Sequence, residues 1–292
     1  MPSNGHMSAL LPVLLILSPV SLPPAPATQP IELTVQSRGA TLAATLQLPT
    51  TGRAPFPAIV LAHGSGRTTR DQMRWMADPF LSMGVAVLTY DKRGVGRSTG
   101  TYVNVGTARS IEVFGDLSDD ALACVAVLKL RKDIDAKRIG LGGNSQAGWI
   151  IPLAASKSKD VAFLVITSGP AVTVGEEMEY SRLAGEDPGS VKGLSDAEID
   201  RQMRQFKGPH GYDPVPVLEK LNTPSIWIEG DRDRSVPMVQ TLATLDRLRR
   251  AGRPISVVTL PGAGHALYNP ATGERRNYWP DVRQWLTTHK VL

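Results

Sequence analysis

Ser145 is the residue of this sequence that is best placed to act as a nucleophile. It follows the apolar run RIGLG and lies in GGNSQAG, between Gly143 and Ala147. A nucleophile at the tip of a tight strand-to-helix turn needs small neighbours, because the turn is strained and crowded. Such a turn exposes the hydroxyl group and leaves the next backbone N–H free to face it. The pattern G-x-S-x-G is changed only by the methyl group of Ala147, so we expect a nucleophile turn, although an ordinary glycine-rich turn with an incidental serine would look similar.

The sequence also offers an acid and a base beyond later strands. A serine hydroxyl is a weak nucleophile at neutral pH, so it needs a base whose tautomer an acceptor holds. His265 follows the last apolar run in TLPGAGHAL, and IEGDRDRSVP supplies Asp231 and Asp233. We favour Asp233 because it lies on the loop three residues beyond Gly230, whereas Asp231 fits a turn or an arginine pair. The order serine, acid, histidine is that of the α/β-hydrolases.

A fourth chemical element is a candidate oxyanion loop. A tetrahedral intermediate needs two preorganised N–H donors. The segment HGSG, from His63 to Gly66, follows a buried apolar run. We expect the backbone N–H of Ser65 to be one donor, with Gly66 as the alternative, and the N–H of Gln146 to be the other. His63 itself is expected to orient the loop.

Two further features are expected to be structural. The turn YDKRGVGRSTG, with Asp91 and Arg93, reads as scaffold around the oxyanion loop, with substrate contact as the alternative. Cys124 lies in an apolar helical pattern and reads as a core residue. Histidines and cysteines nowhere cluster at metal-ligand spacing, so we expect neither a metal nor another cofactor.

The elements that must position these residues form an α/β pattern. Residues 31–37 and 41–49 alternate apolar and polar side chains around a turn, which predicts an antiparallel hairpin. Six continuous apolar runs follow, and these predict strands of a mostly parallel, doubly wound sheet. Helical patterns lie between most of them, for example over residues 116–132 and 239–250.

One connection is too long for a simple crossover. Residues 172–222 contain two helical patterns and no strand-like run, and the second pattern opens with a capping box from Ser195 to Glu198. We expect this insertion to form a short lid over the crevice at the strand ends, within one domain spanning residues 28–292.

The leader, residues 1–27, differs from the rest of the chain. It contains no Asp, Glu, Lys or Arg, and its apolar run Leu10–Val20 is followed by Ala25-Pro26-Ala27. The run is too short to span a bilayer but fits a signal peptide cleaved after Ala27. This predicts a secreted or periplasmic protein with no stable membrane insertion after cleavage. An uncleaved or disordered leader is the alternative.

The net charge of +5 does not indicate a nucleic-acid partner. Lys and Arg are scattered, and the short basic cluster at residues 247–253 reads as the exposed end of a helix.

Taken together, these motifs resemble the α/β-hydrolases of the serine esterase and serine aminopeptidase type, which are related to the dienelactone hydrolase and prolyl oligopeptidase catalytic domains. The resemblance rests on HGSG, DKRGVGRS, GGNSQAGW, GDRDRSVP and PGAGH. It implies the α/β-hydrolase fold and a Ser145–His265–Asp233 triad. Dienelactone hydrolases proper carry cysteine where this chain has Ser145, so that activity is not expected.

The expected reaction is hydrolysis of a small-molecule carboxylic ester, with Gly66 and Trp149 as substrate contacts. The first alternative is a peptidase, aminopeptidase or amidase that uses the same triad. Lid acids at positions 176, 177 and 179 could then bind a free amino group, although an exposed acidic helix face explains them more simply. A binding protein without activity on the same fold is the second alternative.

Overall fold

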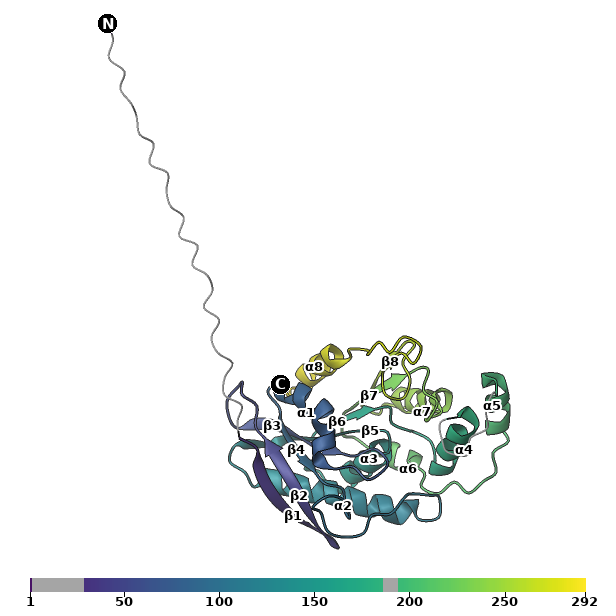
Figure 1. Cartoon of the computed structure of the whole chain (residues 1–292), viewed down its shortest axis with the longest axis horizontal. Helices are drawn as coiled ribbons and strands as arrows, with labels where there is room; N and C mark the ends of the chain where they lie inside the picture. The colour runs from purple at the N-terminus through teal and green to yellow at the C-terminus, as the bar shows by residue number, and fades with distance from the viewer. Residues whose placement is uncertain (2–28, 186–193) are drawn as a thin grey trace.

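The computed structural model describes Met1, residues 29–185 and residues 194–292, so the signal peptide expected over residues 1–27 lies outside it except for Met1 and stays a prediction. Figure 1 shows a central sheet with helices on both faces. The strands are β1 (Ile31–Ser37), β2 (Ala40–Gln47), β3 (Phe56–Ala62), β4 (Ala86–Tyr90), β5 (Ile134–Asn144), β6 (Leu164–Thr167), β7 (Ser225–Gly230) and β8 (Ile255–Leu260). The helices are η1 (Arg70–Met73), α1 (Arg74–Ser82), α2 (Ser110–Lys129), α3 (Ala147–Lys157), α4 (Val174–Ala184), α5 (Asp196–Met203), α6 (Val215–Leu218), α7 (Met238–Arg250) and α8 (Trp279–Thr288).

The strands form one sheet in the order β1-β2-β4-β3-β5-β6-β7-β8. β2 is antiparallel to β1 and to β4, whereas the strands from β4 to β8 run parallel to one another. The predicted hairpin and doubly wound sheet are therefore confirmed. β4 pairs with one edge of β3, and β5, the next strand along the chain, pairs with the other edge. The strand order therefore reverses between β3 and β5. Such a switch point opens a crevice at the carboxyl ends of its strands.

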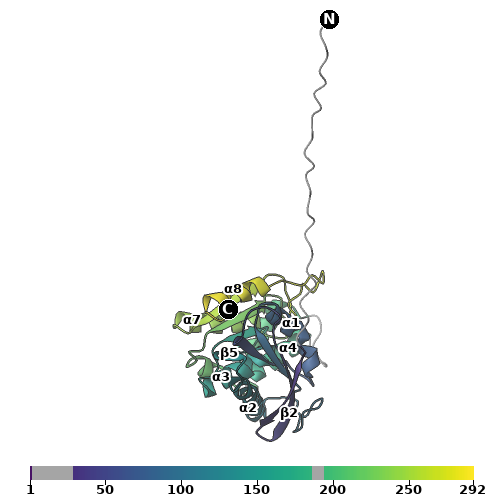
Figure 2. The ribbon, with the colours of Figure 1, turned by 90° about the vertical axis from the view of Figure 1, so that its left-hand side faces the viewer.

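The apolar strands are buried because both faces of the sheet are covered. Along β3, Val60 packs into the core beneath α2 and α3, while Ile59 and Leu61 pack into the core beneath α1 and α8. Figures 1 and 2 show α8 on one side of the sheet and α2 with α3 on the other. Covered strands need no polar face, which explains the continuous apolar runs.

Helix α2 begins at Ser110, six residues earlier than the predicted start at Asp116. The first turns contain Gly115 and the β-branched Ile111 and Val113, which are all weak helix formers. Local propensity therefore does not predict that these turns are helical. Burial of Val113 and Phe114 against the sheet outweighs that propensity. The thiol of Cys124, further along α2, is buried in the core as expected, and burial holds its pKa well above the usual value.

Arg93 ties the loop after β4 to α2. Its guanidinium group donates to both carboxylate oxygens of Asp120 at 2.8 Å and contacts Asp116 at 2.9 Å. The side chain of Asp120 is 0% exposed, whereas that of Asp116 is 36% exposed. Asp91 holds the same loop by accepting from the backbone N–H groups of Arg70 and Arg97.

These contacts predict unequal costs for removing the two acids. Asp120→Asn should lower the free energy of unfolding by about 3–5 kcal/mol, because it removes the fully buried one of the two charge partners of a buried guanidinium. Asp116→Asn removes a contact of the same arginine that water already screens, so it should cost about 0–1 kcal/mol. Urea unfolding followed by circular dichroism measures both. Equal losses would contradict the role given to the buried pair.

The segment from residue 172 to 222 carries α4, α5 and α6 and connects β6 to β7. α4 opens with a full capping box between Thr173 and Glu176. At α5 only half of the predicted box forms: Ser195 accepts from the N–H of Glu198, while the Glu198 carboxylate accepts from Arg201 and Gln202. Over the ranges that the structure describes, no helix is both long and apolar enough to cross a membrane.

Candidate active site

Ser145 lies between the end of β5 and the start of α3, at the carboxyl edge of the sheet beside the switch point. Its φ angle is 53°, in the left-handed region that side chains other than glycine rarely adopt. Its backbone N–H donates to the carbonyl of Thr167 at 2.9 Å, which holds the strained turn against β6. Strain of this kind is typical of a nucleophile turn.

The alanine in the nucleophile motif is accommodated by the glycine that precedes it. A Cβ at Gly143 would collide with the Cβ of Ala147 and with the carbonyl of Ala62. The methyl group of Ala147 therefore occupies space that Gly143 leaves open. A Cβ at Gly148 would lie 2.8 Å from the Cα of Gly169, so the displaced second glycine permits α3 to approach the loop after β6.

His265 and Asp233 complete a hydrogen-bonded chain with Ser145. His265 Nε2 lies 3.0 Å from Ser145 Oγ, and His265 Nδ1 lies 2.8 Å from Asp233 Oδ2. The residue Asp233 is 2% exposed. Its other carboxylate oxygen accepts from the N–H groups of Ser235 and Val236 at 2.8 Å each. Asp231 instead accepts from the N–H of Gly262 at 2.7 Å. The structure thus brings Asp233 to the histidine and uses Asp231 to join two loops.

The sequence reasoning missed two residues that hold the triad loops, Ser168 and Tyr180, and a buried acid near Asp233, Glu229. Ser168 Oγ donates to the His265 carbonyl at 2.6 Å, and the hydroxyl of Tyr180 in α4 donates to the Asp233 carbonyl at 3.0 Å. Glu229 is buried in β7, where burial and the nearby charge of Asp233 hold its pKa well above the usual value. A carboxylate inside the apolar run SIWIEG was a visible signal for Glu229, whereas nothing in the sequence marks Tyr180.

The HGSG loop lies beside the nucleophile. Gly64, Ser65, Trp75, Ser145 and His265 line a cavity of about 300 Å³. Gln146 immediately follows the nucleophile and is the N-cap residue of α3. Both predicted oxyanion donors therefore come from segments that border the hydroxyl group of Ser145. Gly66 lies on the exposed side of this loop and is outside the cavity lining that the described residues form.

His63 orients the loop, as expected. Its Nε2 lies 2.6 Å from the carbonyl oxygen of Tyr90 on the neighbouring strand. Burial, reinforced by the charge of Lys92, lowers the pKa of His63 to about 3. The ring is therefore neutral at physiological pH, and its Nε2–H donates to the carbonyl group.

Lys92 reaches beneath the same loop. Its Nζ donates to the carbonyl oxygens of Gly64 at 2.6 Å and Gly66 at 2.9 Å, and it lies 3.4 Å from Oε1 of Gln146. The residue is 3% exposed, and burial lowers the pKa of its ammonium group to about 8. Lys92 therefore links the two segments that carry the predicted oxyanion donors.

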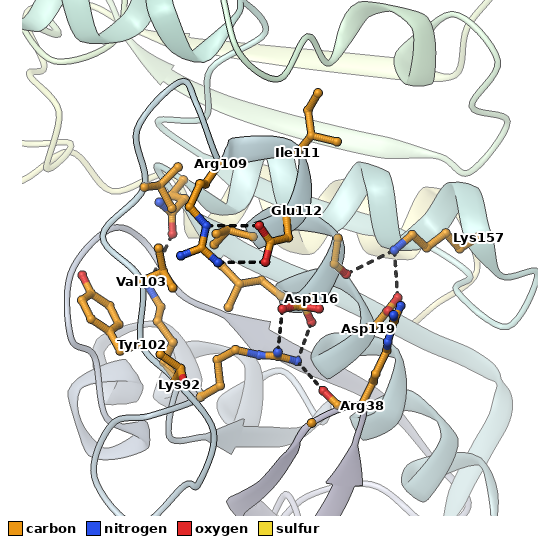
Figure 3. A pocket seen from close by; sticks show the side chains of 18 residues that line it. Arg38, Lys92, Tyr102, Val103, Arg109, Ile111, Glu112, Asp116, Asp119 and Lys157 are labelled. Carbon is orange, nitrogen blue, oxygen red and sulfur yellow. Dashed lines mark hydrogen bonds and ion pairs between the residues drawn. The ribbon is translucent and has the colours of Figure 1, made fainter.

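A larger cavity of about 660 Å³ lies over α2, and Figure 3 shows its charged lining. Most of these charges are paired with one another: Arg109 with Glu112, Arg93 with Asp116, and Lys157 with Asp119. Lys92 and Gln146 also border it, but among the described residues neither Ser145 nor His265 does. The cavity therefore does not open at the nucleophile.

A third cavity, of about 560 Å³, borders the cavity at Ser145. It shares Trp75, Asn144 and His265 with that cavity, so the two are neighbours, and together they are called the groove below. Its far wall is mainly apolar and contains Leu267, Tyr278 and Trp279, with arginines at positions 275 and 276.

Trp149 does not reach this groove, and its expected place beside the substrate is corrected. It is 4% exposed, donates from Nε1 to the carbonyl of Val172 at 2.8 Å and stacks on Phe114 with 5.2 Å between ring centroids. Trp149 lies on the face of α3 that packs against α2, so it belongs to the core.

Two acids of α4, Glu176 and Glu179, contact residues of their own helix or its N-cap. Glu176 accepts from the N–H and hydroxyl groups of Thr173, and Glu179 pairs with Arg182 at 2.7 Å. These contacts match the helix-face interpretation and give no amine-binding cluster at these two acids. Within residues 29–185 and 194–292, no group of three or more histidine, cysteine or acidic side chains is arranged to hold a metal ion.

Comparison with known proteins places these observations in a family. Residues 71–289 match the model of the prolyl oligopeptidase family. The chain is 30% identical to esterase EstD of Thermotoga maritima over 209 residues, which cover 63% of this chain and 48% of the esterase. It is 26% identical to the acylamino-acid-releasing enzyme of Rattus norvegicus over 250 residues, covering 81% of this chain and 32% of that enzyme. The chain thus spans about half or less of the length of these curated relatives.

The fold has solved counterparts. The structure of an esterase of Pyrococcus furiosus superposes with a TM-score of 0.65 at 18% sequence identity, covering 89% of this chain and 92% of that one. This likeness shows the fold.

Proposed function

This chain belongs to the prolyl oligopeptidase family, and we propose that it hydrolyses carboxylic esters through an acyl-enzyme on Ser145. The observation that carries the proposal is the hydrogen-bonded chain from Ser145 Oγ through His265 to Asp233. His265 Nε2 takes the serine proton as Oγ attacks the carbonyl carbon, and Asp233 holds the Nδ1–H so that the ring keeps the required tautomer. The oxyanion is held by the N–H groups of Ser65 and Gln146.

The second half of the reaction reuses the same groups. Protonated His265 gives its proton to the leaving alkoxide, which departs as the alcohol. Water then enters, His265 takes its proton, and the resulting hydroxide attacks the acyl carbon. The bond between the acyl carbon and Ser145 Oγ then breaks, and His265 returns the proton to Oγ. The carboxylic acid product is released. Every proton transfer in this cycle uses His265.

Esters are favoured over peptides by the surroundings of the triad. An ester leaving group needs less help from the site than an amine does. Glu176 and Glu179 are paired with their own helix, so they do not form the acidic pair that a free amino terminus would need. The likeness to an esterase at 30% identity points the same way, although the peptidase relative keeps amide hydrolysis as the rival function.

The apolar groove suggests where the ester binds. Trp75 borders both the cavity at Ser145 and the one that continues to Leu267 and Trp279. We infer that this groove takes the apolar part of the ester, because apolar walls with a few convergent polar groups are typical of small-molecule sites.

The proposal is tested with p-nitrophenyl esters from acetate to dodecanoate beside aminoacyl p-nitroanilides, using Ser145→Ala as the blank. We expect ester turnover to exceed anilide turnover at least tenfold, with short and medium acyl chains preferred. Anilide turnover above ester turnover would identify a peptidase instead. A folded protein that cleaves neither substrate and does not react with a fluorophosphonate would be a binding protein on this fold.

A further inference from the structure

Lys92 is a buried cation that the steps of the proposed reaction do not use. Its Nζ is surrounded by three oxygen acceptors, two from the oxyanion loop and one from the side chain of Gln146. In the part of the chain that the structure describes, no carboxylate forms an ion pair with it. Figure 3 shows it at the edge of the charged cavity, away from the paired charges on α2. Burying an ammonium group without a counter-ion is costly, so its position calls for an explanation.

The contact with Gly64 acts on a predicted donor directly. The carbonyl of Gly64 and the N–H of Ser65 belong to the same planar peptide group and point in opposite directions. Lys92 Nζ holds that carbonyl at 2.6 Å, so it fixes the plane and hence the direction of the Ser65 N–H. A cation on the carbonyl oxygen also polarises the peptide group, which strengthens its N–H as a donor.

The other two contacts extend the same restraint. The carbonyl of Gly66, at 2.9 Å, holds the loop beyond Ser65, where Gly66 has a φ angle of 85°. The side-chain oxygen of Gln146, at 3.4 Å, connects the ammonium group to the residue that supplies the second donor. One side chain thus restrains both segments between which negative charge develops.

We propose that Lys92 is a positioning residue of the oxyanion hole, which fixes the Gly64–Ser65 peptide and Gln146 and adds a positive charge behind both donors. This inference rests on the proposed function. The contribution is larger in the transition state than in the bound ester, because negative charge develops on the substrate oxygen only as the tetrahedral intermediate forms. Removing Lys92 should therefore lower kcat far more than it raises KM.

The test uses Lys92→Met, which keeps the length of the side chain, and Lys92→Gln, which keeps an N–H donor. Lys157→Met is the matched control, since Lys157 borders the same cavity and also donates to three acceptors, Gly115, Ser118 and Asp119. Three quantities are measured: kcat and KM for a p-nitrophenyl ester, the inhibition constant of an alkylboronic acid, and Tm. The boronic acid forms a tetrahedral adduct with Ser145 and mimics the oxyanion.

We expect Lys92→Met to lower kcat about 10- to 100-fold and to change KM by less than about threefold. This fall in kcat is smaller than the one that follows removal of an oxyanion donor itself, about 10²- to 10³-fold. The inhibition constant of the boronic acid should rise by a similar factor. Both the kcat and the inhibition constant of Lys92→Gln should lie between those of the wild type and Lys92→Met. Lys157→Met should match the wild type in both quantities. A folded Lys92→Met or Lys92→Gln with wild-type kcat and boronic acid affinity would overturn the inference. So would a loss shared equally by Lys157→Met. A wild-type protein that neither hydrolyses esters nor reacts with a fluorophosphonate would overturn the proposed function, and this inference with it.

Discussion

Replacing Ser145 by alanine should lower kcat for p-nitrophenyl esters by roughly 10⁴- to 10⁶-fold, the range that follows loss of the nucleophile in other serine hydrolases. The change removes only Oγ, which donates to His265 Nε2 at 3.0 Å. Alanine has the same Cβ as serine, so the turn at a φ angle of 53° carries no new strain. The loss therefore reports the chemistry of the hydroxyl group and not a change of fold. Initial rates on the ester of highest turnover, with Tm for each protein, measure it.

Ser65→Ala is the matched control for this prediction. Ser65 borders the same cavity, but its predicted contribution is the backbone N–H, which alanine retains. We expect its kcat to stay within about fivefold of the wild type, since the main-chain donor is unchanged. A folded Ser145→Ala protein that retains more than a hundredth of the wild-type rate would remove Ser145 from the reaction.

The residues of the triad could be predicted because each one has a local signal. Ser145 lies among small residues after an apolar run, and His265 lies in a glycine-rich loop after another. A parallel sheet brings the carboxyl ends of such runs to one edge, so the spacing along the chain becomes closeness in space. The choice of Asp233 over Asp231 followed from the same rule, because the side chain must lie on the loop and not in the turn that leaves β7.

Two predictions were wrong, the place of the Trp149 side chain and the start of α2. Trp149 is four residues beyond the nucleophile, yet the helical rotation carries its ring toward Phe114 and the core. The first turns of α2 were missed because Val113 and Phe114 owe their helical state to burial against the sheet. Neither fact can be obtained from local propensity, since both depend on which elements pack together.

Lys92 shows the same limit within a motif that was recognised. The turn from Asp91 to Gly100 was predicted to be scaffold around the oxyanion loop, and Asp91 and Arg93 have that role. The contact of Lys92 with Gly64 joins residues that are 28 positions apart in the sequence and follow adjacent strands, and no rule of sequence spacing predicts it. It follows from the pairing of β3 with β4 beside the switch point.

The largest predicted effect outside Ser145 and His265 belongs to Asp233. Asp233→Asn should lower kcat about 10⁴-fold, because an amide can place its NH₂ group toward His265 Nδ1 and so favour the tautomer that cannot accept the serine proton. The fold should survive, since the amide oxygen can still accept from the N–H groups of Ser235 and Val236. Asp231→Asn is the matched control: its oxygen keeps the contact with Gly262, so kcat should change less than about threefold. Steady-state rates on one ester for the two variants decide between the acids. If Asp231→Asn lost more activity than Asp233→Asn, the hydrogen bond of 2.8 Å between Asp233 and His265 would not be the one that holds the catalytic base.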